Sequence, residues 1–137
     1  MIFPDVIDIS IIGVFDRGEP NLERIVLRTN TWVNLSEYGM MIGILGPHNL
    51  ASPIYDHLYY FKTETFLIPD SWIFLYTGPG KDISSKMPDS EEPAYIFHWG
   101  KPFTVFAWTE IIPILFRIGS VQLGYPPGDK IQLGTGE

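Results

Sequence analysis

Short segments in which apolar residues recur at every second position, separated by turn-forming residues, constrain the fold of this chain most strongly. The segment 6–15 alternates isoleucine with aspartate or serine, which is the period of a strand with one buried face. The segment 71–77 concentrates aromatic and aliphatic residues that favour strands. Residues that accept turn dihedrals occupy 16–21 and 68–70. Long amphipathic helices are not visible, and the pattern predicts an all-β sandwich or barrel.

The same pattern predicts the individual elements. We expect strands over 6–15, 22–29, 32–35, 38–45, 56–62, 71–77 and 94–99. Residues 78–93 are rich in proline, glycine and acidic side chains and predict a long surface loop. The segment 103–108 fits either a strand or an irregular buried segment. The segment 111–118 carries a helical stripe, but Pro113 fits poorly inside a helix, so its structure stays open.

Two further local features carry structural predictions. Gly39 and Gly43 interrupt an apolar segment, which predicts bulges or a close approach of another backbone. The segments 121–125 and 130–133 flank a Pro-Pro-Gly-Asp sequence, which is typical of a hairpin.

The composition is that of a globular protein. The 137 residues suit one domain, 1–137, and 45% of them are hydrophobic against 18% charged, so the chain has enough apolar surface to form a core. A net charge of −7 opposes binding to nucleic acid and to anionic membranes. The sequence contains no cysteine, which excludes disulfides and cysteine-based zinc sites.

Targeting and membrane-spanning segments are not apparent in the sequence. Residues 1–5 lack the basic region of a signal peptide. The most apolar window, 103–116, includes Glu110 and Pro113 and is shorter than the ~20 apolar residues that a membrane span needs. We therefore expect no membrane insertion, and we leave the compartment open with the cytoplasm as the default.

A series of short motifs runs through the chain in a recognisable order. The segment 33–40 contains Val, Leu-Ser, Tyr and Met at fixed spacing, and 65–69 ends in Ile-Pro. An alternating strand at 72–78 ends in Thr-Gly, an aromatic segment follows at 95–100, and Gly-Ser-Val-Gln-Leu closes the series at 119–123. Together these motifs resemble the lamin-tail domain family, in the form that occurs in bacterial proteins.

The resemblance covers roughly residues 6–125. It implies an immunoglobulin-like β-sandwich of about eight or nine strands and a non-enzymatic structural or protein-interaction module. The chain has Glu37-Tyr38 where the family has Gly-Trp, and its segment 103–118 is longer and more apolar than the family's.

Candidate catalytic and metal-binding residues lack the spacing of known sites. His48, His57 and His98 do not form an HExxH or HxH motif, and polar outward positions on strands account for them equally well. The segment 78–81 lacks the remainder of a phosphate-binding loop, and the acidic residues of 82–92 lack EF-hand spacing. We therefore expect no enzymatic activity, no metal and no cofactor.

The aromatic residues are the remaining candidates for function. Trp72, Phe74 and Tyr76 lie on one face of a strand whose other face is also apolar, and the same holds for the segment 95–99. The outer face then needs a cover, which is either the segment 103–118 or another molecule.

Two functions follow from this alternative. If a protein partner or a second copy covers the face, we expect Phe74, Tyr76 and Phe97 to form the interface. The alternative is a small-ligand or carbohydrate-binding domain, in which Trp72, Trp99 and Trp108 form stacking platforms.

Overall fold

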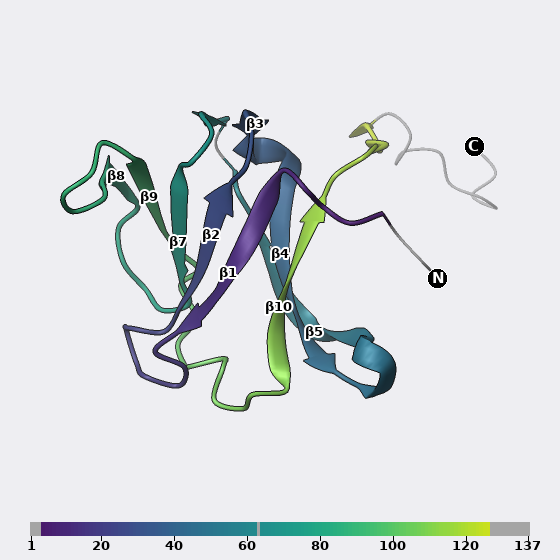
Figure 1. Cartoon of the computed structure of the whole chain (residues 1–137). Helices are drawn as coiled ribbons and strands as arrows, with labels where there is room; N and C mark the ends of the chain where they lie inside the picture. Colours follow the sequence, from purple (N-terminus) through teal and green to yellow (C-terminus); the bar gives the residue numbers. More distant parts are fainter. Residues whose placement is uncertain (1–3, 63, 127–137) are drawn as a thin grey trace.

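The computed structural model describes residues 4–62 and 64–126 and shows that the protein is mostly β (Figure 1). Its five-stranded sheet has the order β1 (Ile9–Phe15), β2 (Arg24–Thr29), β7 (Trp72–Tyr76), β9 (Pro93–His98) and β8 (Ile83–Lys86). Its three-stranded sheet has the order β10 (Ile111–Arg117), β4 (Tyr38–Leu45) and β5 (Ala51–Tyr60). A small sheet joins β3 (Val33–Asn34) to β6 (Phe66–Leu67), and the 3-10 turns are Leu35–Glu37 and Pro47–Asn49. The prediction of an all-β fold is confirmed.

The structure corrects two of the expected elements and decides one segment, 111–118, that the sequence left open. The stretch 78–93 is not a continuous loop, because β8 lies within it and pairs antiparallel with β9. The segment 111–118 is a strand for most of its length: β10 pairs with β4 and places Pro113 opposite Ile42. Residues 121–125 form no strand, and the rest of the expected hairpin lies outside the described residues. Among the described strands, all pairs are antiparallel except β7 and β9, which run parallel.

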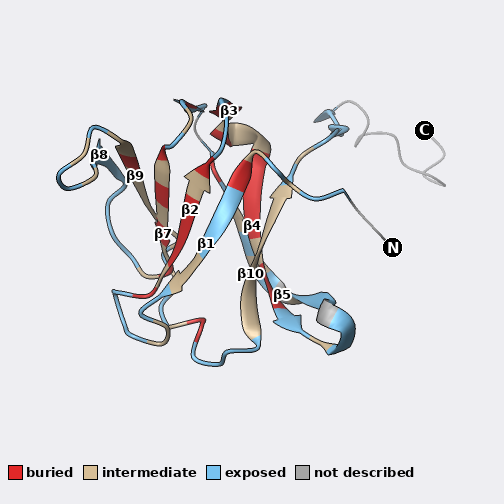
Figure 2. Ribbon diagram, viewed as in Figure 1, coloured by how far each residue is buried: buried red, intermediate tan, exposed pale blue. Residues whose placement is uncertain are grey.

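The core lies between the two larger sheets, where Figure 2 shows the buried positions of β2, β4 and β7. It is made mainly of aliphatic side chains from these strands, joined by Phe61 and Phe106. Strand β7 shows most clearly how alternate residues form the core, because Ile73 and Leu75 are buried while the residues on either side are partly exposed. This is the period-two pattern that the sequence predicts.

The glycines of β4 allow its neighbours to lie flat against it. A Cβ atom at Gly39 would lie 2.7 Å from the carbonyl oxygen of Tyr59, and one at Gly43 would lie 3.0 Å from that of Ser52. The pairing of β4 with β5 also shifts register between Met41 and Gly43. Both the close approach and the bulge that the sequence predicts are therefore confirmed.

A buried carboxylate joins three segments at one end of the sheets. Glu23 is 1% exposed, and its Oε1 atom accepts hydrogen bonds from the backbone N–H of Gly18 (2.9 Å) and Phe106 (2.8 Å). Its Oε2 atom accepts from the Thr77 hydroxyl (2.5 Å) and the Val105 N–H (2.8 Å). Four donors thus compensate for the removal of this charge from water.

The segment 103–118 contributes both to the hydrogen bonds of Glu23 and to the three-stranded sheet. Val105 and Phe106 are buried beside Glu23, and the residues that follow form β10. Of the two alternatives for the cover of the outer face of β7 and β9, the segment 103–118 is therefore not the one that the structure shows. It closes one end of the space between the sheets instead.

We predict that Glu23→Gln destabilises the protein by roughly 2–4 kcal/mol, because a buried amide cannot accept all four hydrogen bonds and brings its own donors against two N–H groups. Urea unfolding followed by circular dichroism measures this difference. Glu19→Gln, an exposed change in the same turn, is the matched control and should stay within about 0.5 kcal/mol of wild type. If Glu23→Gln does not fold, Thr77→Val removes a single donor and should cost about 1–2 kcal/mol. Equal stability of Glu19→Gln and Thr77→Val would contradict the prediction.

The same carboxylate predicts a pH dependence of stability. Burial raises the pKa of Glu23, but the hydrogen bonds from Thr77 and from three backbone N–H groups outweigh this effect and leave the pKa below its ordinary value of 4.5. Such a group stabilises the fold above the pKa of the unfolded chain, and the contribution is lost as the pH falls through the lower pKa of the folded state. We therefore expect the stability gap between wild type and Glu23→Gln to be largest at neutral pH and to shrink below about pH 4.5. A gap that is constant from neutral to acidic pH in urea titrations would refute this.

Candidate interaction surfaces

The outer face of the five-stranded sheet carries aromatic rings and arginines side by side. The register places Arg24 beside Tyr76, Arg28 beside Trp72, and Tyr76 beside His98. Together with neighbouring side chains they form a surface that we call the aromatic–arginine face. It consists of Phe15, Arg24, Arg28, Trp72, Phe74, Tyr76 and His98. Within the described residues, no strand or helix packs over this face (Figure 1).

One end of the aromatic–arginine face is held by Glu92. The Arg28 guanidinium lies 4.8 Å from the centroid of the Trp72 ring, which is a cation–π contact. Glu92 accepts a hydrogen bond from the Trp72 indole N–H (3.1 Å) and forms an ion pair with Arg28 (2.5 Å). The bond from Trp72 and the charge of Arg28 lower the pKa of Glu92 against the opposing effect of burial. The arginine and the indole are therefore fixed before any partner arrives.

The other end is organised around Arg24. Its guanidinium lies 5.5 Å from the Phe15 centroid and 5.7 Å from the Tyr76 centroid, and it pairs with Asp16 at 2.6 Å. The Tyr76 ring stacks on the His98 ring, with centroids 5.3 Å apart. The result is a row of planar groups that spans four strands, β1, β2, β7 and β9.

The structure brings together half of the residues that the sequence singles out. Trp72, Phe74 and Tyr76 share the aromatic–arginine face, and Trp72 stacks on Phe74 with centroids 6.4 Å apart. Phe97 is a correction. The parallel pairing sets it beside Leu75 on the inner face, where its ring packs 5.2 Å from that of Phe61. Its place on the outer face is taken by His98, which the sequence pattern did not assign to an interface.

The other two tryptophans lie elsewhere. Trp99 packs on the core from the inner side, 5.5 Å from Tyr59, with the Lys101 ammonium over its ring. Trp108 is 68% exposed in the segment before β10. The three tryptophans therefore form no common platform. Whether Trp72 or Trp108 alone binds a ligand stays a prediction.

The three histidines have different surroundings. His48 is exposed in a turn with positive φ, and His98 stacks on Tyr76. His57 lies in β5, where burial and the charge of Lys101 lower its pKa despite Asp56 beside it. In residues 4–62 and 64–126, no three histidine or acidic side chains converge on a point that could hold a metal ion.

A second uncovered surface escaped the sequence reasoning. The outer face of the three-stranded sheet, here called the aliphatic face, carries no charged side chain at its central positions, and these are Met41, Leu58, Tyr60, Ile112, Ile114 and Phe116. Leu58 and Tyr60 are 47% and 46% exposed, and the Tyr60 ring meets the Phe116 ring edge-on at 5.9 Å. The signal in the sequence was the glycine pair of β4 beside an isoleucine-rich segment. The sequence did not predict this face, because it left open whether 111–118 forms a helix or a strand.

Comparisons with protein-family models, with curated proteins and with solved structures found no match to this chain. No helix among the described residues is long and apolar enough to cross a membrane.

Substitutions on β7 should separate the exposed face from the core. We predict that Phe74→Ala costs less than about 1.5 kcal/mol, because the ring is partly exposed, whereas Leu75→Ala costs about 2–5 kcal/mol. The two residues are adjacent on one strand, so each serves as the control for the other. Chemical denaturation of both variants measures the difference, and equal losses would show that Phe74 is part of the core.

Proposed function

We propose that this protein is a non-enzymatic protein-interaction module that binds its partner through the aromatic–arginine face. The observation that carries the proposal is the row of stacked rings and guanidinium groups on a sheet face over which no described strand or helix packs. Tryptophan, tyrosine and arginine are the side chains that most often dominate binding energy at protein interfaces.

The fixed geometry of these side chains supports the proposal. Association costs free energy when mobile side chains become ordered, roughly 0.5–1.5 kcal/mol for each flexible side chain. Arg24 and Arg28 are already held by Asp16 and Glu92, and each lies over an aromatic ring. A partner that covers this face would therefore bury rings and guanidinium planes at a small further cost in entropy.

We also propose that the fold is an immunoglobulin-like sandwich of the lamin-tail type. The chain order supports this: β1 and β2 pair, the chain crosses to β4 in the other sheet, and it returns as β7 beside β2. Immunoglobulin sandwiches place their strands A, B and E in one sheet and C in the other in the same way. The parallel pair of β7 and β9 departs from the antiparallel pairing of that scheme.

The absence of enzymatic activity is part of the same proposal. Glu23, the most buried carboxylate of the core, has both oxygens occupied by four protein donors and has none free for proton transfer. Among the described residues, no three histidine or acidic side chains cluster, which leaves no group of titratable side chains of the kind that catalytic sites assemble.

Carbohydrate or small-ligand binding is the alternative function. It is favoured by the partly exposed Trp72 and the largely exposed Trp108, since sugars stack on accessible indole rings. Their separation limits each of them to a small site of its own.

The test compares two double variants in direct binding. Proteins captured from an extract by the wild-type chain are identified, purified and titrated calorimetrically against wild type, against Phe74→Ser with Tyr76→Ser, and against Leu58→Ser with Tyr60→Ser. The second pair changes one apolar residue and one tyrosine on the aliphatic face, both more exposed than Phe74 and Tyr76, and is the control. Thermal unfolding first establishes that both double variants are folded.

We expect a purified partner to bind wild type and the control with equal affinity. Its affinity for the double variant Phe74→Ser with Tyr76→Ser should be lower by about tenfold or more, which is ~1.4 kcal/mol. A partner that binds all three proteins equally would refute the use of this face. Binding to a glycan array that is lost with Trp72→Ala or Trp108→Ala would favour the alternative function instead.

A further inference from the structure

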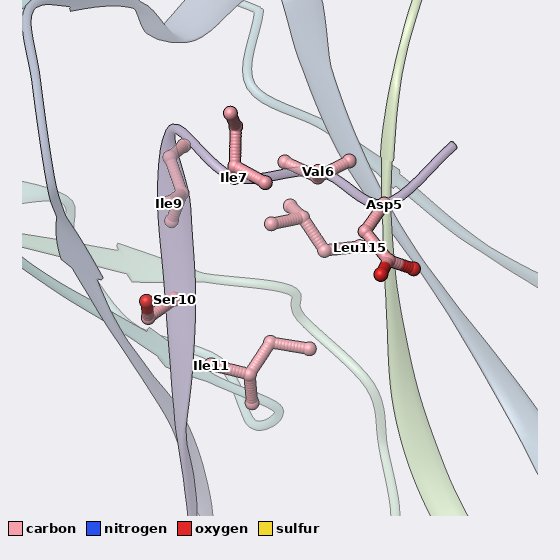
Figure 3. Close-up of a pocket in the computed structure, with 7 residues that line it drawn as sticks. All are labelled: Asp5, Val6, Ile7, Ile9, Ser10, Ile11 and Leu115. Atoms are coloured by element: carbon pink, nitrogen blue, oxygen red, sulfur yellow. The ribbon is translucent and has the colours of Figure 1, made fainter.

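Along one long side of the molecule, the edge strands β1 and β10 of the two sheets contact each other at a few positions but form no hydrogen-bonded pair. A cleft of about 600 Å³ lies there and is lined by Asp5, Val6, Ile7, Ile9, Ser10, Ile11 and Leu115. Figure 3 shows Ile11 pointing from β1 toward β10 and Leu115 pointing back toward β1. Ile9 and Ile11 pair with Thr29 and Leu27 and so belong to the inner face of their sheet. The cleft is therefore an opening into the core.

Both walls of the cleft are the edges of sheets. Strand β1 pairs only with β2, and β10 pairs only with β4, among the strands that the structure describes. Their outer N–H and C=O groups lack a neighbouring strand, and such groups are a template for another strand. Strand β1 has no proline and no charged residue over its seven positions, whereas β10 carries Pro113, which lacks an N–H. Every residue of β1 therefore has a backbone N–H, whereas β10 lacks one at Pro113.

The charge at the cleft selects the partner. Asp5 lies on its rim beside β10 (Figure 3) and forms no ion pair with another described residue. Asp8, nearby, accepts a hydrogen bond from the Tyr38 hydroxyl at 2.8 Å and lies 3.4 Å from Arg117. Since the whole chain carries a net charge of −7, a basic segment is attracted and an acidic one is repelled.

We propose that this cleft binds an extended segment of a partner protein, which adds to the edge of β1 as a further strand. The segment carries apolar residues at every second position, which contact Ile11 and Leu115, and a lysine or arginine that reaches Asp5. An unpaired strand edge favours a polypeptide over a lipid or a sugar, because only a peptide backbone supplies donors and acceptors at the spacing of a strand. This site is separate from the aromatic–arginine face, which lies on the outer side of the same sheet.

A displayed library of random peptides of about ten residues, the length of a long strand, tests the proposal. The library is selected on the full chain, and each enriched peptide is synthesised and titrated by fluorescence anisotropy. Ile11→Lys places a charge in the cleft. Ile12→Lys is the matched control, because Ile12 lies at the bulge of the same strand and is similarly exposed, 46% against 39% for Ile11.

We expect enriched peptides with alternating apolar residues and a basic residue. Their affinity should fall about tenfold or more with Ile11→Lys and change by less than about twofold with Ile12→Lys. Asp5→Asn should weaken the basic peptides, and the effect should shrink at high salt. Amide hydrogen exchange should show new protection along β1 when such a peptide is bound.

Three results would overturn the proposal. The library could yield no peptide whose binding depends on Ile11. The enriched peptides could bind Ile11→Lys as well as wild type and lose affinity with Phe74→Ser and Tyr76→Ser, which would assign them to the aromatic–arginine face. Light scattering could show a wild-type dimer that Ile11→Lys converts to a monomer, in which case a second copy of the chain fills the cleft.

Discussion

The carboxylate of Glu23 is the interaction on which the rest of the structure depends. It lies at the start of β2, and its four hydrogen bonds tie this strand to the turn at Gly18, to the end of β7 at Thr77 and to the segment around Phe106. Thr77 and Phe106 lie 54 and 83 residues away from Glu23 in the sequence. A charge this deeply buried is tolerated only with such complete compensation, so the position of each donor is constrained by the others. The segment that Glu23 holds at Phe106 then leads into β10.

That path decides which surfaces remain open. Since the residues after β9 close the end of the sheets and then build β10, they are not free to cover the outer face of β7. The aromatic–arginine face and the aliphatic face consequently both lack a described strand or helix packed over them, and no hydrogen-bonded pairing joins β1 to β10. The two faces differ in chemistry. One presents rings held by paired arginines, which suits specific recognition, and the other presents uncharged and mainly aliphatic side chains, whose burial is not directional.

The open edge of β1 raises a further physical question. Edge strands are usually protected by charged side chains, by proline or by bulges, because an unprotected edge pairs with other chains. Strand β1 has only the bulge at Ile12, with Gly13 beside it, whereas β10 has Pro113. The acidic residues before β1 and the net charge of the chain supply repulsion between copies instead. Because of this repulsion, the edge of β1 disfavours pairing with a second copy of the chain and remains available to a basic segment.

The sequence by itself determined what is local. Period-two alternation located most of the strands. Turn-forming residues located the breaks at 16–21 and 68–70, and Gly39 and Gly43 indicated where backbones approach. Tertiary structure decided what depends on pairing partners. The parallel register of β9 turned Phe97 inward and His98 outward, pairing with β4 made 111–117 a strand, and pairing with β9 made 83–86 a strand within a polar stretch. Alternation fixes that neighbouring side chains point in opposite directions, but only contact with a second sheet fixes which direction is buried.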